Sequence, residues 1–153
     1  MRILVLSGPN LGSLGRRQPE IYGTTTLAEV HARLLEEART LGVEVRCEQS
    51  NHEGTLIDLL EEESGRSRAC VINPGGLAHT SVVLADAVRG FAGPVVEVHL
   101  SNILGREEYR RTSHVAAAAT AVIAGAGAGG YLLALRAAVQ LTGDAEQHSE
   151  TTR

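Results

Sequence analysis

The sequence predicts an α/β fold in which one parallel β-sheet is covered by helices on both faces. Three observations indicate this class: short apolar runs recur along the chain, helical stretches separate them, and turn residues follow several of the runs. Strands that are apolar throughout are typical of parallel sheets buried on both faces. A length of 153 residues suits one domain, expected over residues 1–142, followed by a polar, disordered tail over 143–153.

The expected elements alternate between strand and helix. The strands are expected at residues 2–7, 43–50, 69–73, 94–100 and 116–125. The helices are expected at residues 26–42, 54–63, 79–89 and 130–141. Thr26 and Glu29 fit a capping box at the start of the first helix, and Gly42 fits its end. Five strands so arranged predict a doubly wound, flavodoxin-like sandwich, in which ligands bind beyond the carboxyl ends of the strands.

Composition disfavours several classes of partner. The formal charge is −4, the arginines are scattered, and the aromatic residues are too few to stack nucleic-acid bases, so no nucleic-acid partner is expected. No apolar run approaches the ~20 residues of a membrane span, and no signal-like segment opens the chain. We therefore expect a cytoplasmic protein with a small-molecule substrate and no membrane partner.

The residue types also restrict the chemistry. All 14 basic residues are arginines, so neither a lysine Schiff base nor the lysine of a P-loop can form. Carbonyl chemistry in this protein would have to pass through an enol or an enolate. Cys47 and Cys70 lie in apolar segments and are expected to be buried thiols; without clustered histidines no metal site is predicted.

Two glycine-rich segments resemble nucleotide or phosphate motifs. Residues 125–130 (GAGAGG) match G-x-G-x-x-G, but they follow the last strand, so no second strand can supply the ribose-binding acid. We interpret them as a tight turn with close helix packing. The glycines of residues 8–15 could hold a phosphate, although the flexibility of a mobile loop would explain them equally well.

Tyr22 stands in a segment that shows no sign of packing. It follows Arg16, Arg17 and Glu20 within the sequence GRRQPEIYG, whereas a tyrosine placed for packing normally sits among aliphatic residues. The connection from residue 8 to residue 25 is long for a compact domain, and long connections are often active-site lids. The alternative is a partly exposed surface tyrosine.

Polar residues follow the later strands. Glu97 and His99 are i and i+2 on one strand, so both point to the same face and should pair, since an unpaired buried charge is costly. Asn73 lies at a strand end, and His79 and Asp86 are expected on one face of a shared helix. A buried structural pair and a surface helix start are the alternatives.

The strand with Glu97 is followed by further polar groups. Ser101 and Asn102 offer hydroxyl, amide and backbone donors at its end. Arg106 and Arg110 are i and i+4 on one helical face, although a solvated charged helix is the commonest explanation for such a run.

Four stretches in this order, GPNLGSLGRRQPEIYG, QSNHEG, INPGGLAHTS and EVHLSNILGREEYRRTS, resemble the type II dehydroquinase family (3-dehydroquinate dehydratase). The resemblance covers residues 3–141. It implies a flavodoxin-like fold and cofactor-free elimination of water from 3-dehydroquinate to give 3-dehydroshikimate, in the shikimate or quinate pathway. It also implies a homododecamer built from trimers, with Asp86 reaching toward a neighbour's site.

The resemblance further implies the roles of individual residues. Tyr22 would be the base, Arg17 its partner in the lid, and His99 the acid. The residues implied around the substrate are Asn73, His79, Asp86, Leu100, Ser101 and Arg110. The supporting positions are Asn10 and Glu97 for catalysis and Arg106 for substrate binding.

This sequence departs from the family pattern at three places that carry no catalytic group. Leu104-Gly105 stands where a histidine-alanine pair is common, Ser7 stands where asparagine is common, and residues 114–119 are unusually rich in alanine.

The implied chemistry fits these residue types. A free phenol is mostly protonated at neutral pH, and nearby arginines favour its phenolate, which could take the proton next to a ketone. His99, oriented by Glu97, would protonate the departing hydroxyl. Backbone amides at Leu100 and Ser101 suit a substrate carboxylate.

Two alternatives belong to other classes. A flavin-binding or receiver module is disfavoured, because the aromatic residues are few and the lysine of a receiver is missing. A catalytically idle family member that serves assembly or regulation is disfavoured by the intact set of Arg17, Tyr22 and His99.

Overall fold

The computed structural model describes the backbone of residues 1–151 and the side chains of residues 1–145. Its sheet contains five parallel strands in the order β2-β1-β3-β4-β5. The strands are β1 (Arg2–Ser7), β2 (Glu44–Gln49), β3 (Ala69–Asn73), β4 (Val95–His99) and β5 (Ala121–Ala124). The predicted doubly wound, flavodoxin-like sheet is confirmed, and its strand order reverses between β1 and β3.

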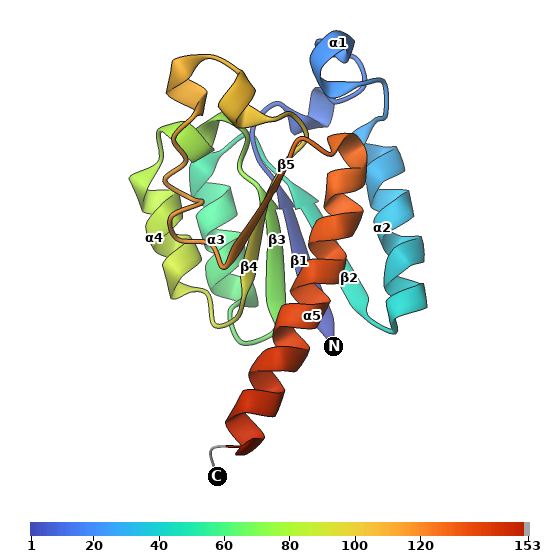
Figure 1. Cartoon of the computed structure of the whole chain (residues 1–153), viewed down its shortest axis with the longest axis vertical. Coiled ribbons are helices and arrows are strands. Elements are labelled where there is room, and N and C mark those ends of the chain that lie inside the picture. The colour runs from blue at the N-terminus through green and yellow to red at the C-terminus, as the bar shows by residue number, and fades with distance from the viewer. Residues whose placement is uncertain (152–153) are drawn as a thin grey trace.

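Helices cover both faces of this sheet (Figure 1). The helices are α1 (Pro19–Tyr22), α2 (Leu27–Leu41), α3 (Glu53–Glu63), α4 (Val82–Gly90) and α5 (Gly130–Thr151). Helices α2 and α5 pack on one face and α3 and α4 on the other. In the described part of the chain, no helix is both long and apolar enough to cross a membrane.

Alternation along β1 divides the core into two apolar clusters. Ile3 and Val5 point into the cluster under α2 and α5, whereas Leu4 and Leu6 point into the cluster under α3 and α4. All four side chains are fully buried. The uninterrupted apolar run of residues 3–6 is therefore explained by burial on both faces, as the sequence predicted.

The predicted signals at both ends of α2 are confirmed. The Thr26 side chain accepts a hydrogen bond from the Glu29 N–H, and the Glu29 carboxylate accepts one from the Thr26 N–H. Gly42 ends the helix in the left-handed conformation (φ 69°).

The predicted helix over residues 79–89 starts later than expected. His79 ends a separate 3₁₀ turn, η2 (Gly75–His79), and α4 begins at Val82 after Ser81, whose hydroxyl accepts the N–H of Leu84. His79 and Asp86 therefore do not share a helix, and that prediction is wrong. The serine cap sets the true start of the helix.

Three other boundaries also differ. Strand β5 occupies only Ala121–Ala124, because the preceding alanines form a turn in which Ala118 and Ala119 donate to the Val115 carbonyl. The run with Arg106 and Arg110 forms two 3₁₀ turns, η3 (Ile103–Gly105) and η4 (Glu108–Arg110), and no α-helix.

The expected irregular tail is the last of these differences. Helix α5 continues through Thr151, where an irregular segment was expected from residue 143, and residues 152–153 lie outside the described residues. Disorder of the tail stays a prediction. Alanine, glutamate and glutamine are good helix formers and can extend a helix that tertiary packing has already begun.

The turn prediction for residues 125–130 agrees with the backbone. Gly125 and Gly127 have positive φ angles of 86° and 59°. A side chain at Gly130 would begin 3.2 Å from Val98, so the start of α5 packs closely on β4.

Candidate active site

A pocket lies at the carboxyl ends of β1, β3 and β4, beside the point where the strand order reverses. It encloses about 690 Å³, part of it open to solvent. In Figure 1 the lid helix α1 and the turns after β4 rise over this same edge of the sheet. The predicted residues that line it are Asn10, Arg17, Tyr22, Asn73, His79, His99, Leu100, Ser101, Arg106 and Arg110.

The lid segment brings Tyr22 to the pocket mouth. Tyr22 is the last residue of α1, a single helical turn that starts with Pro19. The next residue, Gly23, caps the turn with a positive φ of 77°. Its hydroxyl accepts a hydrogen bond of 2.7 Å from Nη1 of Arg106. The Arg106 guanidinium carbon also lies 5.3 Å from the centre of the tyrosine ring.

This contact changes the expected partner of Tyr22. The sequence suggested the neighbouring arginines of the lid, above all Arg17, whereas the described hydrogen bond comes from Arg106, 84 residues away. Arg17 lines the same pocket without a described bond to the phenol. Arg106 thus adds to its expected place near the substrate a direct contact with the candidate base.

The Glu97–His99 pair forms as the strand spacing predicted. His99 Nε2 hydrogen-bonds Oε1 of Glu97, and the same oxygen accepts a 2.8 Å bond from the Ser113 hydroxyl. Glu97 is fully buried and His99 nearly so. The carboxylate therefore fixes the plane of the imidazole, and Nδ1 is the ring nitrogen left for other contacts.

Asn73 and His79 line the wall beside this pair. The ring of His79 stacks near that of His99, with centroids 6.2 Å apart, and its Nδ1 donates to the Thr112 carbonyl at 2.8 Å. Asn73 is buried, and its Oδ1 accepts the N–H of Gly75 at 3.1 Å. Each side chain thus has a hydrogen-bond partner in the backbone.

The loops after β1 and β3 pack backbone against backbone. A Cβ atom at Gly8 would lie 2.7 Å from the Pro74 carbonyl oxygen, and one at Gly75 would lie 2.9 Å from the Pro9 carbonyl oxygen. Glycine is therefore required at both positions by the close approach of the two loops. This explains Gly8, one of the glycines that the sequence left open between phosphate binding and loop flexibility.

The second strand supports the loop that carries Asn10. Asn10 has a left-handed backbone (φ 69°), and its N–H donates to Oδ1 of Asn51 at 3.0 Å. Gln49 donates to the Gly8 carbonyl and to Asn51. Sequence analysis gave Gln49 and Asn51 no role, although both lie in the QSNHEG stretch, which begins at the last residue of β2.

The pocket is rich in positive charge. Arg17, Arg106 and Arg110 line it, and the one carboxylate at its base, Glu97, is engaged by His99 and Ser113. Arg110 is held by Glu107 at 3.0 Å. An anionic ligand is therefore favoured, and guanidinium groups are suited to bind a carboxylate or hydroxyl groups.

Asp86 is the predicted site residue that the structure places elsewhere. It lies on α4, is largely exposed, and pairs with Arg89 at 2.9 Å. The groove that it lines runs between α3 and α4 and shares no residue with the pocket. Within one chain Asp86 is not part of this site, since α4 begins only after the turn that brings His79 to the pocket.

Besides Gln49 and Asn51, two supporting residues were missed by sequence analysis. Ser113 holds Glu97, and the buried hydroxyl of Tyr131 lies 2.8 Å from the Ser7 hydroxyl under the pocket floor. Tyr131 stands in an apolar helical run that looked like core, so only its hydroxyl could have signalled a second role. Among the described residues, His, Cys, Asp and Glu form no group of three that could hold a metal.

Comparisons with known proteins agree with this geometry. The sequence profile of the family "Dehydroquinase class II" matches residues 1–139. A 3-dehydroquinate dehydratase of Pelotomaculum thermopropionicum is 51% identical over 143 residues, which cover 94% of this chain and 99% of that protein.

Solved structures give the same result. The type II dehydroquinase of Butyrivibrio crossotus aligns with a TM-score of 0.88 at 37% identity, covering 90% of this chain and 96% of that one. The type II dehydroquinase of Propionibacterium acnes aligns with a TM-score of 0.87 at 45% identity, covering 91% and 96%. The chain therefore belongs to the class II dehydroquinase family and is a dehydratase of the lyase class.

Proposed function

We propose that this protein converts 3-dehydroquinate to 3-dehydroshikimate through an enolate, using only its own side chains. The observation that carries the proposal is the pocket itself, which is lined both by a phenol bonded to a guanidinium and by the imidazole of a buried carboxylate–imidazole pair. A base and an acid in one pocket are what an elimination needs, since one group removes a proton while the other assists the leaving group.

Tyr22 is assigned as the base. Its oxygen takes the proton from C2, which lies next to the C3 ketone, and the electron pair of that C–H bond moves into the enolate. The positive charge of Arg106, 2.7 Å from this oxygen, stabilises a phenolate there. Arg17 lines the same pocket and adds a second positive charge. Asn10 is assigned to the enolate oxygen, through a water molecule.

His99 is assigned as the acid. When the enolate re-forms the ketone, the C1–O bond breaks, a double bond forms between C1 and C2, and the hydroxyl leaves as water with a proton from His99. Glu97 holds the imidazole in place for this transfer. Tyr22 then gives its extra proton to solvent and His99 takes one back from solvent, so the enzyme returns to its starting state.

The remaining residues fix the substrate. Asn73, His79 and Arg110 present polar groups that suit the ring hydroxyls, and the backbone after β4 at Leu100 and Ser101 suits the substrate carboxylate. Arg106 also donates to the Ser101 hydroxyl at 3.3 Å, so it links the base to this part of the pocket. Shikimate synthesis or quinate breakdown would both use this step.

The test follows the ultraviolet absorbance of the conjugated product with purified protein. We expect dehydration by wild type and a loss of about 10²–10⁴-fold in kcat for Tyr22→Phe, because the base is removed while the ring stays. Tyr109→Phe is the matched control, since Tyr109 is 63% exposed and lines no part of the pocket. An inactive wild type would overturn the function, and an active Tyr22→Phe would overturn the assignment of the base.

We also propose that the chain assembles as a homododecamer built from trimers, in which Asp86 approaches the pocket of a neighbouring subunit. This is supported by exposed apolar side chains around it on α4, Val82 (58% exposed) and Val83 (53% exposed). Light scattering would give the assembly mass, and Val83→Glu should reduce it. A monomer at assay concentration would contradict the assembly. A cytoplasmic location stays a prediction for cell fractionation to test.

A further inference from the structure

A buried phenol lies beneath the pocket and contributes nothing to its lining. Tyr131, on α5, is fully inaccessible and is surrounded by the apolar cluster under α2 and α5. Its hydroxyl lies 2.8 Å from the hydroxyl of Ser7, which is also fully buried at the end of β1. Burying a hydroxyl costs free energy unless both its hydrogen and its oxygen are hydrogen-bonded, so this phenol needs a second partner besides Ser7.

The second partner of the phenol is a residue of the pocket. Asn73 is the strand neighbour of Ser7, and its side chain acts on the Tyr131 hydroxyl as a hydrogen-bond partner that lowers the pKa of the phenol. Oδ1 of Asn73 accepts the N–H of Gly75 at 3.1 Å. Oδ1 has a second lone pair, but a hydrogen bond that lowers the pKa of a phenol is one donated to its oxygen, so the amide nitrogen donates to the phenol. The phenol hydrogen is then directed to Ser7, the other described partner of this buried hydroxyl.

This order requires a phenol that stays neutral. Burial raises the pKa of Tyr131 far above its ordinary value, although its hydrogen bonds to Ser7 and Asn73 act in the opposite direction. The hydroxyl therefore keeps its proton and can donate and accept at once. An amide has two N–H donors and two acceptor lone pairs, so one donor and one lone pair of Asn73 are left for other groups.

We propose that Tyr131 is a positioning residue, which with Ser7 sets the orientation of the Asn73 amide at the pocket wall. The amide then offers a fixed donor and a fixed acceptor, a pair that suits a hydroxyl group, which both accepts and donates. An amide turned by 180° would offer them in exchanged places. The inference rests on the proposed function for its kinetic consequence, namely recognition of a ring hydroxyl of the substrate.

The kinetic test replaces Tyr131 by phenylalanine, which removes only the oxygen. We expect KM to rise about tenfold while kcat changes less, because a ground-state contact is lost. In an Asn73→Ala background the same change should have no further effect on KM. Thr142→Val is the matched control, since Thr142 also carries a buried hydroxyl on α5, bonded to the Ala138 carbonyl, away from the pocket.

The structural test uses neutron diffraction of wild type and Tyr131→Phe, which locates the amide hydrogens. The variant should show the Asn73 amide reoriented or in two orientations. If Tyr131→Phe does not fold, Ser7→Ala removes the phenol's acceptor instead and should give the same result.

The outcomes separate this inference from the proposed function. An unmoved amide, or an equal rise in KM with and without the Asn73 side chain, would overturn the positioning role. A wild type that does not dehydrate 3-dehydroquinate would overturn the function, while the diffraction result would still decide the role of Tyr131.

Discussion

Replacing Arg106 with glutamine tests which cation supports the Tyr22 oxygen. Arg106 Nη1 donates to that oxygen at 2.7 Å, and the Arg106 side chain is 14% exposed, so water screens the contact only in part. A hydrogen bond to a charged group contributes about 1.5–3 kcal/mol. Since 1.36 kcal/mol is a factor of ten in rate, Arg106→Gln should lower kcat by about 10–100-fold.

The assay is kcat and KM from the ultraviolet absorbance of the product. A larger fall in kcat than rise in KM is expected, because negative charge on the phenol matters most in the transition state. Arg111→Gln is the control, since Arg111 is exposed in the same segment and does not line the pocket. Arg17→Gln should fall between the two. If Arg106→Gln is as active as Arg111→Gln, the contact contributes nothing and the assignment is wrong.

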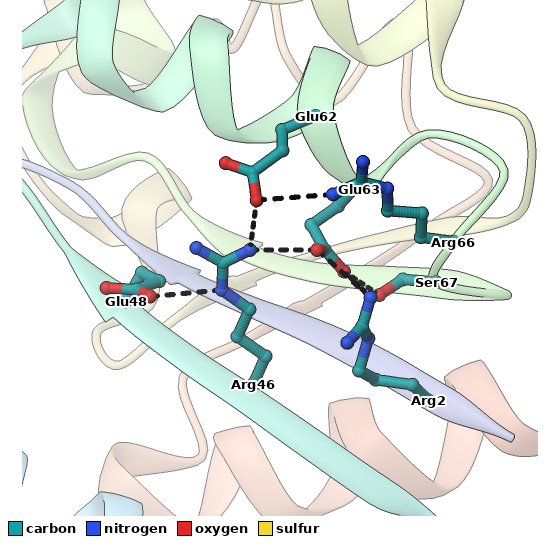
Figure 2. A network of polar contacts seen from close by, with 7 residues as sticks. All are labelled: Arg2, Arg46, Glu48, Glu62, Glu63, Arg66 and Ser67. Atoms are coloured by element: carbon teal, nitrogen blue, oxygen red, sulfur yellow. Dashed lines mark hydrogen bonds and ion pairs between the residues drawn. The ribbon is translucent and has the colours of Figure 1, made fainter.

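Two further predictions concern stability and the enolate route. Glu63 is 1% exposed and binds Arg2, Arg46 and Ser67 (Figure 2). Burial by itself raises the pKa of Glu63. The three partners outweigh this effect and hold the pKa below the ordinary glutamate value. Its charge therefore stabilises the fold above the ordinary glutamate pKa, and this contribution disappears as the pH falls. Glu63→Gln should lose about 1–3 kcal/mol at neutral pH and little in acid by thermal unfolding; equal losses at both pH values would refute it. Borohydride added with substrate should not inactivate the enzyme, since no lysine can form an imine; irreversible loss of activity would contradict the enolate route.

The fold and the Glu97–His99 pair could be predicted from sequence because they depend on local geometry. Apolar runs such as residues 2–7 indicate strands buried on both faces, and the capping box at Thr26 marks the start of a helix. Glu97 and His99 are two apart on a strand, so the pleat alone puts them on one face.

The contacts between loops could not be predicted in this way. The helix expected to join His79 with Asp86 is interrupted by the Ser81 cap, which separates the two side chains between different surfaces. The segment that contains Arg106 forms two 3₁₀ turns where one α-helix was expected, so the backbone does not follow the path of a straight helix.

The sequence by itself determined the alternation of strands and helices, the strand ends at which polar residues gather, and the lack of lysine, which excludes an imine with a lysine side chain. Only the tertiary structure decided that Arg106 bonds Tyr22 and that Tyr131 lies beneath Asn73. The physical reason is that periodicity is set by backbone geometry over a few residues. A contact across 84 residues depends instead on how whole loops and helices pack.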